Sequence, residues 1–313
     1  GMKARRWVGA VLFFLLTAVL IYGAGRLLEG DNVYPETTAT RQADGCDVIF
    51  VGTSHGDMAV DPIAIFQHNG IAAYNFAASG QYIGITRMAL EEILARQTPQ
   101  VVVIDYQCLF PVSSQALRAE FNVRFSLRQL ASPLRRAEAF RTWVGQDWLY
   151  AIPLFRYHGA WEPTDTPDVR YEYRMGWRIS DGVTPFDALP APEPEEPLPL
   201  IEPEQTYLHE MLALCERHGA RAVLLNYPEY VAGDGLERAM ATYADVGGFA
   251  FWDGNAYLEE IGLDPATDFY DGNHLNRFGA GKLSLWLADQ LRAEFDLPDR
   301  RGNPAYEAWN LTQ

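Results

Sequence analysis

The feature that most constrains this chain is a short apolar run that ends in a glycine and two hydroxyl residues, VIFVGTSHG at residues 48–56. Because a half-exposed strand would alternate polar and apolar residues, residues 48–51 are expected to form a strand buried on both faces. Gly52 lets the backbone turn sharply after it. Ligands of open α/β sheets bind beyond the carboxyl ends of the strands, so Ser54 is a candidate nucleophile. Thr53 and Ser54 could equally cap a following helix, and this stretch alone leaves both readings open.

Further apolar runs alternate with segments of helical periodicity. Strands are expected at residues 72–76, 101–105, 223–226 and 249–252. Helices are expected at 83–95, 204–218 and 277–295, together with one that starts at Pro62 after an Asp61 cap. The alternation of strand and helix predicts an α/β fold with a five-stranded parallel sheet.

Composition divides the chain into four parts. Residues 1–28 are predicted to be a membrane anchor, 29–45 a linker, 46–298 the main domain and 299–313 a tail without a clear pattern. Within the main domain the alternation is interrupted at residues 107–203, which contain a helical pattern at 121–143, an aromatic-rich stretch and a proline–glutamate run. We interpret 107–203 as an insertion after the third strand, either a cap over a cleft or a surface excursion.

The N-terminal segment has the features of a membrane helix. Lys3, Arg5 and Arg6 precede residues 7–25, which carry no charge and are about long enough to cross a bilayer. Basic residues before the span favour a cytoplasmic N-terminus, which predicts a single-pass membrane protein whose main domain lies outside the cytoplasm. Small residues at 23–25 also fit a cleaved signal peptide, but the apolar run exceeds the usual signal core of about 7–15 residues.

Charge and cysteine content exclude several classes of function. The chain has 41 acidic and 25 basic residues and a formal charge of −16, which argues against binding nucleic acid or anionic lipid surfaces. Its three cysteines are scattered and odd in number, so they predict neither a disulfide framework nor a metal site. We expect no metal and no cofactor.

A second polar stretch, DFYDGNHLN at residues 268–276, precedes the last predicted helix. A serine hydroxyl is a poor nucleophile until a base takes its proton, and a histidine base works best when a carboxylate fixes its tautomer. Asp271 and His274 are close enough in sequence for that hydrogen bond, so Ser54, Asp271 and His274 form a candidate catalytic triad. The alternative is a turn that caps the last helix.

The order of these motifs resembles the SGNH (GDSL-type) hydrolase superfamily. GTS at 52–54 is similar to its first block, NFAASG at 75–80 to its second, and D-x-x-H at 271–274 to its last. The stretch at 52–56 also fits the G-x-S-x-G elbow of the α/β-hydrolases, but that elbow follows several strands and its acid and histidine lie on separate loops. The resemblance implies a flavodoxin-like three-layer sandwich, with Ser54 as nucleophile and the Ser54 and Gly80 N–H groups binding the oxyanion.

The third block of that superfamily, G-x-N-D, is absent. Residues 106–111 read YQCLFP, so Leu109 occupies the place of the oxyanion asparagine. Loss of one such donor can cost about two to three orders of magnitude in rate. Gln107 and His55 are candidate accessory residues. His55 and Asp57 either tune the site or are exposed residues at a helix start, and we favour the second interpretation.

The missing block, the anchor and the insertion together resemble a membrane-tethered subset of the superfamily. That subset includes the D-alanine-transfer protein of teichoic acid modification and the alginate O-acetylation proteins. The resemblance implies acyl transfer or ester hydrolysis on a cell-surface glycopolymer, with a membrane-bound O-acyltransferase as partner. Two alternatives stay open: a secreted lipase or carboxylesterase of small esters, and a non-catalytic polymer-binding subunit of an O-acylation complex.

Overall fold

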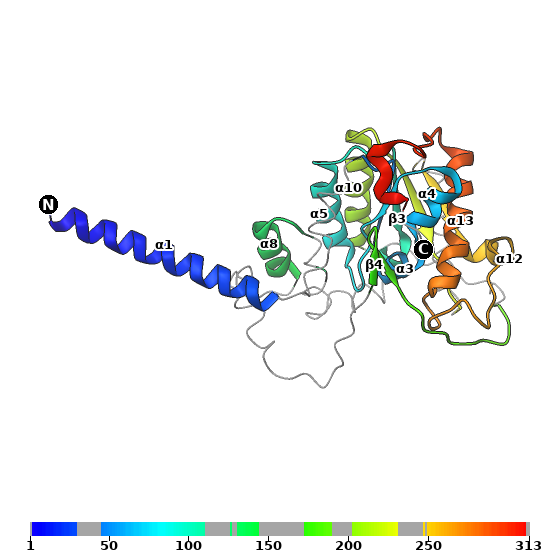
Figure 1. Ribbon diagram of the computed structural model, residues 1–313, viewed down its shortest axis with the longest axis horizontal. Helices are drawn as coiled ribbons and strands as arrows, with labels where there is room; N and C mark the ends of the chain where they lie inside the picture. Colours follow the sequence, from blue (N-terminus) through cyan, green and yellow to red (C-terminus); the bar gives the residue numbers. More distant parts are fainter. Residues whose placement is uncertain are drawn as a thin grey trace.

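The computed structural model describes residues 2–29, 45–109, 126, 130–143, 172–189, 202–230, 247 and 249–310. A sheet that includes β3 lies at the centre of the α/β domain (Figure 1). It has five parallel strands in the order β2-β1-β3-β6-β7. The strands are β1 (Val48–Val51), β2 (Ala73–Asn75), β3 (Val101–Asp105), β6 (Arg221–Asn226) and β7 (Ala250–Asp253). The predicted α/β fold with a five-stranded parallel sheet is therefore confirmed.

The strand order creates a switch point. From β1 the chain moves to β2 on one side, then crosses back to β3 on the other side of β1. A crevice at such a point, beyond the carboxyl ends of the strands, is the usual ligand site of open α/β sheets. Ser54 follows β1 and Gln107 follows β3, so the sequence places polar groups on both sides of this switch point.

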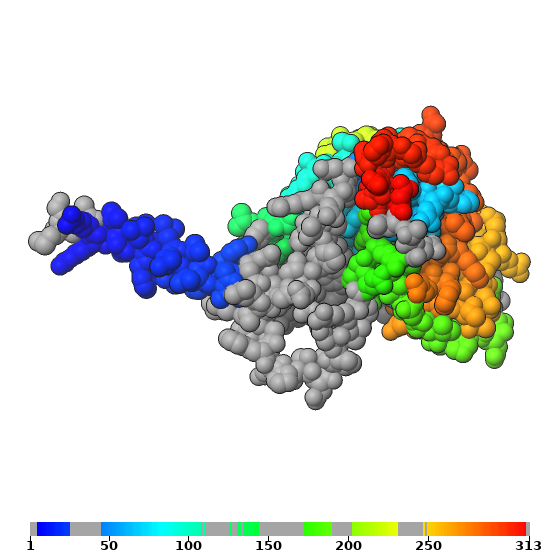
Figure 2. Space-filling model, viewed as in Figure 1, coloured from blue at the N-terminus to red at the C-terminus, as the bar shows by residue number. Residues whose placement is uncertain are grey.

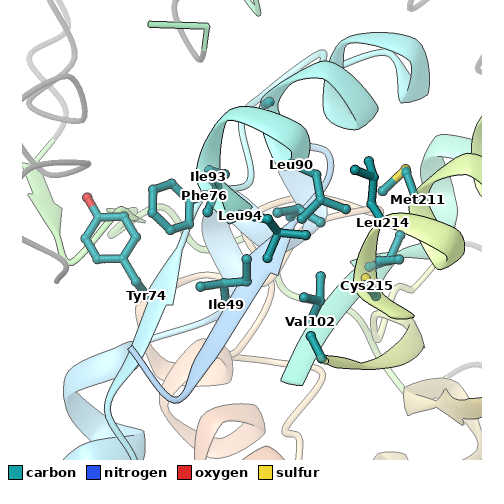
Figure 3. Close-up of a cluster of buried hydrophobic side chains, with 14 of the residues drawn as sticks. Ile49, Tyr74, Phe76, Leu90, Ile93, Leu94, Val102, Met211, Leu214 and Cys215 are labelled. Carbon is teal, nitrogen blue, oxygen red and sulfur yellow. The ribbon is translucent and has the colours of Figure 1, made fainter. Parts of the chain in front are cut away.

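Helices cover both faces of the sheet. One face is covered by α5 (Ile83–Leu94) and α10 (Glu204–Arg217), the other by α3 (Ser54–Ala59), α4 (Pro62–Asn69) and α13 (Arg277–Glu294). Side chains of β1 and β3 alternate between the two cores, so Ile49 and Val102 meet α5 and α10 (Figure 3) while Val48 and Val101 meet the opposite layer. Burial on both faces explains why these strands are continuously apolar.

Local signals set the helix boundaries as the sequence predicted. The Asp61 Oδ1 atom accepts hydrogen bonds from the N–H groups of Ile63 (2.9 Å) and Ala64 (3.2 Å), so Asp61 caps α4 ahead of Pro62. The Asn276 side chain does the same for α13 through the N–H groups of Phe278 and Gly279.

The insertion after β3 contributes several described elements. They are the 3-10 turn η2 (Tyr106–Leu109), α8 (Pro133–Trp143) and an antiparallel hairpin of β4 (Glu172–Arg174) and β5 (Trp177–Ile179). The helical pattern at 121–143 is described only at 126 and 130–143, and most of the aromatic-rich stretch and of the proline–glutamate run lies outside the described residues. The hairpin docks on the main domain, because the Trp177 indole N–H donates to the Met58 carbonyl oxygen at 2.8 Å.

The N-terminal helix α1 (Met2–Glu29) appears as a rod beside the α/β domain in Figure 1. Its segment Arg5–Gly25 has 21 residues with a mean hydropathy of 2.2, and 6% of its most apolar window is buried. By length and composition this helix could cross a membrane, and a signal sequence would share these properties.

The C-terminal segment, which has no clear sequence pattern, packs on the domain through η6 (Pro304–Trp309). Figure 2 shows it (red) against the light-blue surface of α4. The Trp309 indole is buried and donates to the Ala73 carbonyl oxygen at 2.8 Å, while Arg300 pairs with buried Asp47 at 2.7 Å. The segment therefore shields the β2 edge of the sheet.

Candidate active site

Ser54 stands at the first position of α3, directly beyond the carboxyl end of β1. The tight turn before it requires glycine: Gly52 has φ +148°, and a Cβ there would lie 2.1 Å from the Cβ of Asp105 on the neighbouring strand. Thr53 caps the helix by accepting from the His55 N–H, so the two sequence readings of this stretch are compatible. The first N–H groups of a helix have no acceptor within it, and the Ser54 N–H is one of these groups.

The loop before α13 orients the other two triad candidates. The Asp271 Oδ1 atom accepts from the backbone N–H groups of Asn273 (2.8 Å) and His274 (2.9 Å). The same carboxylate contacts the Nδ1 atom of the His274 ring at 2.8 Å through Oδ1 and at 3.0 Å through Oδ2. Because a carboxylate only accepts, Nδ1 carries the proton and Nε2 presents its lone pair.

Ser54 and His274 are 220 positions apart in sequence, and the structure brings them together. The Ser54 Oγ atom lies 2.7 Å from the His274 Nε2 atom. Ser54, His274 and Asp271 thus form a continuous chain of hydrogen bonds in the order that activation of a serine hydroxyl requires.

The surroundings keep His274 in its neutral form. Burial lowers the pKa of His274, the positive charges of His55 and Arg178 lower it further, and Asp271 only partly opposes them. For Asp271, burial favours the protonated form, but hydrogen bonds from the His274 ring and from backbone N–H groups hold its pKa below the ordinary value. At neutral pH the pair is therefore a carboxylate beside a neutral imidazole, the state that a general base needs.

Gly80 lies in the turn after β2, with φ +68°. Two contacts fix this turn relative to α3. Buried Asn75 donates through Nδ2 to the Gly56 carbonyl oxygen at 2.7 Å, and the Ser79 hydroxyl donates to the Asp57 carboxylate at 2.8 Å. That the Gly80 N–H binds an oxyanion stays a prediction.

Asp57 is part of a buried ionic network that sequence reasoning missed. Its side chain is 0% exposed and accepts from the Arg178 Nε atom at 2.8 Å, and a second Arg178 nitrogen donates to the Ser79 hydroxyl at 2.8 Å. Arg178 comes from β5 of the insertion, so one side chain connects the serine-bearing helix, the Gly80 turn and the hairpin. Burial raises the pKa of Asp57, and Arg178 opposes that rise.

The interpretation of His55 and Asp57 as exposed helix-start residues is therefore wrong. The His55 side chain is 14% exposed, and its ring stacks on that of His274 with centroids 4.9 Å apart and planes at 29°. The short helix α3 turns these side chains inward because the hairpin and the segments after β3 and β6 cover it. No local pattern in the sequence contains that information.

Gln107 lies in η2, where the superfamily pattern places its third block. Its side-chain amide donates to the Glu229 Oε1 atom at 2.5 Å, and its backbone N–H donates to Asp105 at 2.8 Å. Leu109 is fully buried in the core, and its side chain has no hydrogen-bond donor. Glu229, three positions after β6, was not singled out from the sequence, although an acidic residue just beyond a central strand is the signal that could have identified it.

The segment after β5 supports the acid–histidine loop. The Ser180 carbonyl oxygen accepts from the Arg277 N–H at 2.8 Å, and Thr184 bonds to the carbonyl oxygens of Phe269 (2.9 Å) and Tyr270 (2.7 Å). Residues 177–186 therefore contact each of the segments that carry Ser54, Gly80 and His274.

Among the residues that the structure describes, no group of three or more His, Cys, Asp or Glu side chains is placed to hold a metal ion.

No family model and no curated protein matches this sequence. Among solved structures, a putative acylhydrolase from Bacteroides fragilis is 13% identical with a TM-score of 0.40, over 85% of this chain and 99% of that one. A GDSL-like lipase from Bacteroides thetaiotaomicron is 12% identical with a TM-score of 0.37, over 84% and 99%. A gut microbial diltiazem-metabolizing enzyme is 12% identical with a TM-score of 0.36, over 79% and 47%. These likenesses are loose.

Proposed function

We propose that this protein is a serine-dependent acyl-transfer enzyme that hydrolyses or transfers an ester through a covalent acyl-Ser54 intermediate. The observation that supports this most directly is the 2.7 Å contact between Ser54 Oγ and His274 Nε2, with Asp271 on the opposite ring nitrogen. A serine, a neutral histidine and a carboxylate in this order are the parts that nucleophilic acyl transfer needs.

In the first half-reaction, His274 Nε2 takes the hydroxyl proton as Ser54 Oγ attacks the ester carbonyl. The tetrahedral intermediate carries its negative charge on the former carbonyl oxygen, which the N–H groups of Ser54 and Gly80 would bind. Its collapse breaks the carbon–oxygen bond of the ester, and the Nε2 proton goes to the departing alkoxide. Asp271 stabilises the imidazolium that exists between the two proton transfers.

In the second half-reaction, an acceptor replaces the departed alcohol. Neutral His274 takes a proton from water or from an acceptor hydroxyl, whose oxygen attacks the acyl-Ser54 carbonyl. Collapse then breaks the bond to Ser54 Oγ and returns the proton to it. Water gives hydrolysis, and a sugar or polymer hydroxyl gives transfer.

The acceptor that we propose is a cell-surface glycopolymer, such as a polysaccharide or a teichoic-acid-like chain. Support comes from the apolar helix α1, which would hold the domain at the outer face of the cell membrane, and from the resemblance to the membrane-tethered subset. A membrane-bound O-acyltransferase is the proposed partner. A hydrolase of small esters would share the same serine chemistry but would not need that partner.

Covalent labelling tests the proposed chemistry. The full chain in detergent is treated with a fluorophosphonate, which reacts with activated serines. We expect labelling of the original protein and of a Ser132→Ala control, whose hydroxyl accepts from the Arg135 N–H at the start of α8, but not of Ser54→Ala. Unlabelled yet folded protein would instead favour a non-catalytic polymer-binding subunit.

A second experiment separates transfer from hydrolysis. The protein is incubated with an aryl acetate and an acetyl-free polysaccharide, and the polymer is isolated and assayed for ester-linked acetate. Transfer predicts polymer-bound acetate that disappears in Ser54→Ala. Release of acetate alone, with none on the polymer, would assign the activity to hydrolysis.

A further inference from the structure

The hydrogen bonds around His55 determine its protonation state. The Thr53 hydroxyl lies 2.5 Å from the Asp105 carboxylate and 3.1 Å from the His55 Nδ1 atom. A hydroxyl has one proton to donate, and the Asp105 carboxylate, which also accepts N–H bonds from Thr53 and Gln107, takes it. Burial raises the pKa of Asp105, while the charge of His55 and these hydrogen bonds favour the carboxylate form. The Thr53 oxygen must therefore accept from His55, so Nδ1 carries a proton.

The other ring nitrogen of His55 faces a second carboxylate. Its Nε2 atom is buried and lies 3.7 Å from the Glu229 Oε2 atom, and no hydrogen-bond partner is closer among the residues that the structure describes. A lone pair at Nε2 would be repelled by the negative charge of the Glu229 carboxylate, whereas an N–H group at Nε2 is attracted to that charge. Both ring nitrogens thus favour a proton, which makes His55 an imidazolium. Burial lowers the pKa of His55, but the nearby carboxylates, Glu229 first among them, raise it above its ordinary value.

This charged ring stacks directly on the ring of His274, with centroids 4.9 Å apart. At that distance in a partly buried site, like charges repel appreciably. The imidazolium form of His274, which exists only during the reaction, is therefore made a better proton donor by its neighbour. Among the described residues, the charged groups that act on the two rings are Asp105, Glu229, Asp271 and Arg178.

We propose that His55, held as an imidazolium against the ring of His274, is a positioning residue that promotes proton transfer from His274 to the departing alcohol. This inference rests on the proposed function and adds a specificity to it. Esters of ordinary alcohols, including sugar hydroxyls, release poor leaving groups and need that proton. Aryl esters release stable phenolates and do not.

The step that His55 assists is the collapse of the tetrahedral intermediate. The carbonyl of acyl-Ser54 re-forms, the carbon–oxygen bond to the leaving group breaks, and the His274 Nε2 proton moves to that oxygen. A neutral alcohol departs and His274 becomes neutral again. The same His55 charge makes His274 a weaker base while Ser54 attacks the ester. Asp271 offsets this effect because it stabilises the charged His274 ring.

The test compares His55→Gln with the original protein on two acetate esters, nitrophenyl acetate and ethyl acetate. The glutamine can still donate to Thr53 but carries no charge. We expect kcat/KM to fall by about three- to tenfold for ethyl acetate and by less than about twofold for nitrophenyl acetate, because a pKa change of half a unit to one unit in His274 alters its proton transfer by at most that factor. His68→Gln, a change at an exposed histidine paired with Asp289, is the matched control and should leave both rates unchanged.

The pH profile gives a second readout. Removing the positive charge should raise the pKa of His274, so the acid limb of kcat/KM should move to higher pH by about half a unit to one unit. Equal losses on the two esters together with an unmoved acid limb would mean that His55 is merely structural and would overturn the inference. Failure of Ser54 labelling would overturn the proposed function itself, so the two failures are distinguishable.

A spectroscopic measurement covers the case in which His55→Gln does not fold. In Ser54→Ala protein with nitrogen-15-labelled histidines, the ring-nitrogen shifts at pH 7 should identify His55 as doubly protonated and His274 as protonated on Nδ1 alone. The His55→Gln spectrum, or that of Glu229→Gln if the former is unfolded, assigns the signals. A neutral His55 at pH 7 would refute the inference.

Discussion

Replacing Arg178 by alanine would leave the Asp57 carboxylate in a fully buried position without the guanidinium that now contacts it at 2.8 Å. Breaking a buried pair by removing one partner typically costs about 3–5 kcal/mol, since the remaining charge is desolvated and uncompensated. Arg178 is 12% exposed, so some water can enter the space that it vacates. We therefore expect a loss of about 2–3 kcal/mol in the free energy of unfolding for Arg178→Ala.

A double-mutant cycle isolates the interaction free energy between Arg178 and Asp57. Asp57→Asn alone should cost about 1 kcal/mol, because a neutral amide can keep part of the hydrogen bonding to Ser79 and Arg178. The double variant should be more stable than Arg178→Ala alone, with a coupling of about 1–2 kcal/mol. Urea unfolding of the full chain in detergent, followed by tryptophan fluorescence, measures all four proteins.

The sign of the pH dependence is also fixed. Burial raises the pKa of Asp57 in the folded protein, so the native state holds this proton more tightly than the unfolded chain. Without Arg178 that pKa rises further. The loss in the free energy of unfolding caused by Arg178→Ala should therefore be largest at neutral and higher pH. It should shrink as the pH falls through the pKa of Asp57 in the folded variant. This reasoning would be refuted if the two single variants lost stability additively and if the loss of Arg178→Ala did not change with pH.

Three other perturbations have defined outcomes. Since His274 must be neutral to act as a base and its pKa is lowered mainly by burial, the acid limb of kcat/KM should lie below the ordinary histidine value, which a pH–rate profile measures. Asp271→Asn should reduce kcat by about 10³–10⁴ with little change in KM, because the ring loses its acceptor at Nδ1, and steady-state kinetics would show a smaller loss if Asp271 were only a helix-loop residue. Gly52→Ala should destabilise the fold by more than about 3 kcal/mol, since its Cβ would meet that of Asp105 at 2.1 Å, and a melting temperature near that of the original protein would contradict the turn geometry.

The parts of this molecule that the sequence predicted are those fixed by local signals. A continuous apolar run identified β3 at its observed boundaries, and an aspartate before a proline identified the start of α4. The meeting of Ser54 and His274 also followed from topology, because both lie beyond the carboxyl ends of parallel strands in one sheet. Sequence patterns were sufficient for these three inferences because each required only whether a segment is a helix or a strand and in which direction the strand runs.

The missed features depend on contacts between distant segments. Asp57 looked like an ordinary first-turn acid, and nothing near it in sequence indicates that Arg178, more than a hundred positions later, neutralises it. His55 looked exposed until Glu229 and the ring of His274 were found against it. The role of Trp309 could not be predicted either, since its indole covers the β2 edge through a contact with Ala73, which lies far away in the sequence. Burial of a polar side chain is decided by what packs over it, which no local pattern encodes.

The most direct test of the central claim is mass spectrometry of the protein quenched in acid soon after mixing with nitrophenyl acetate. Our account predicts an acetyl group on the peptide that contains Ser54, formed faster than it is lost, and its absence in Ser54→Ala and in His274→Ala. Acetyl groups spread over lysines or other serines, with the Ser54 peptide unmodified while the substrate is being consumed, would contradict it.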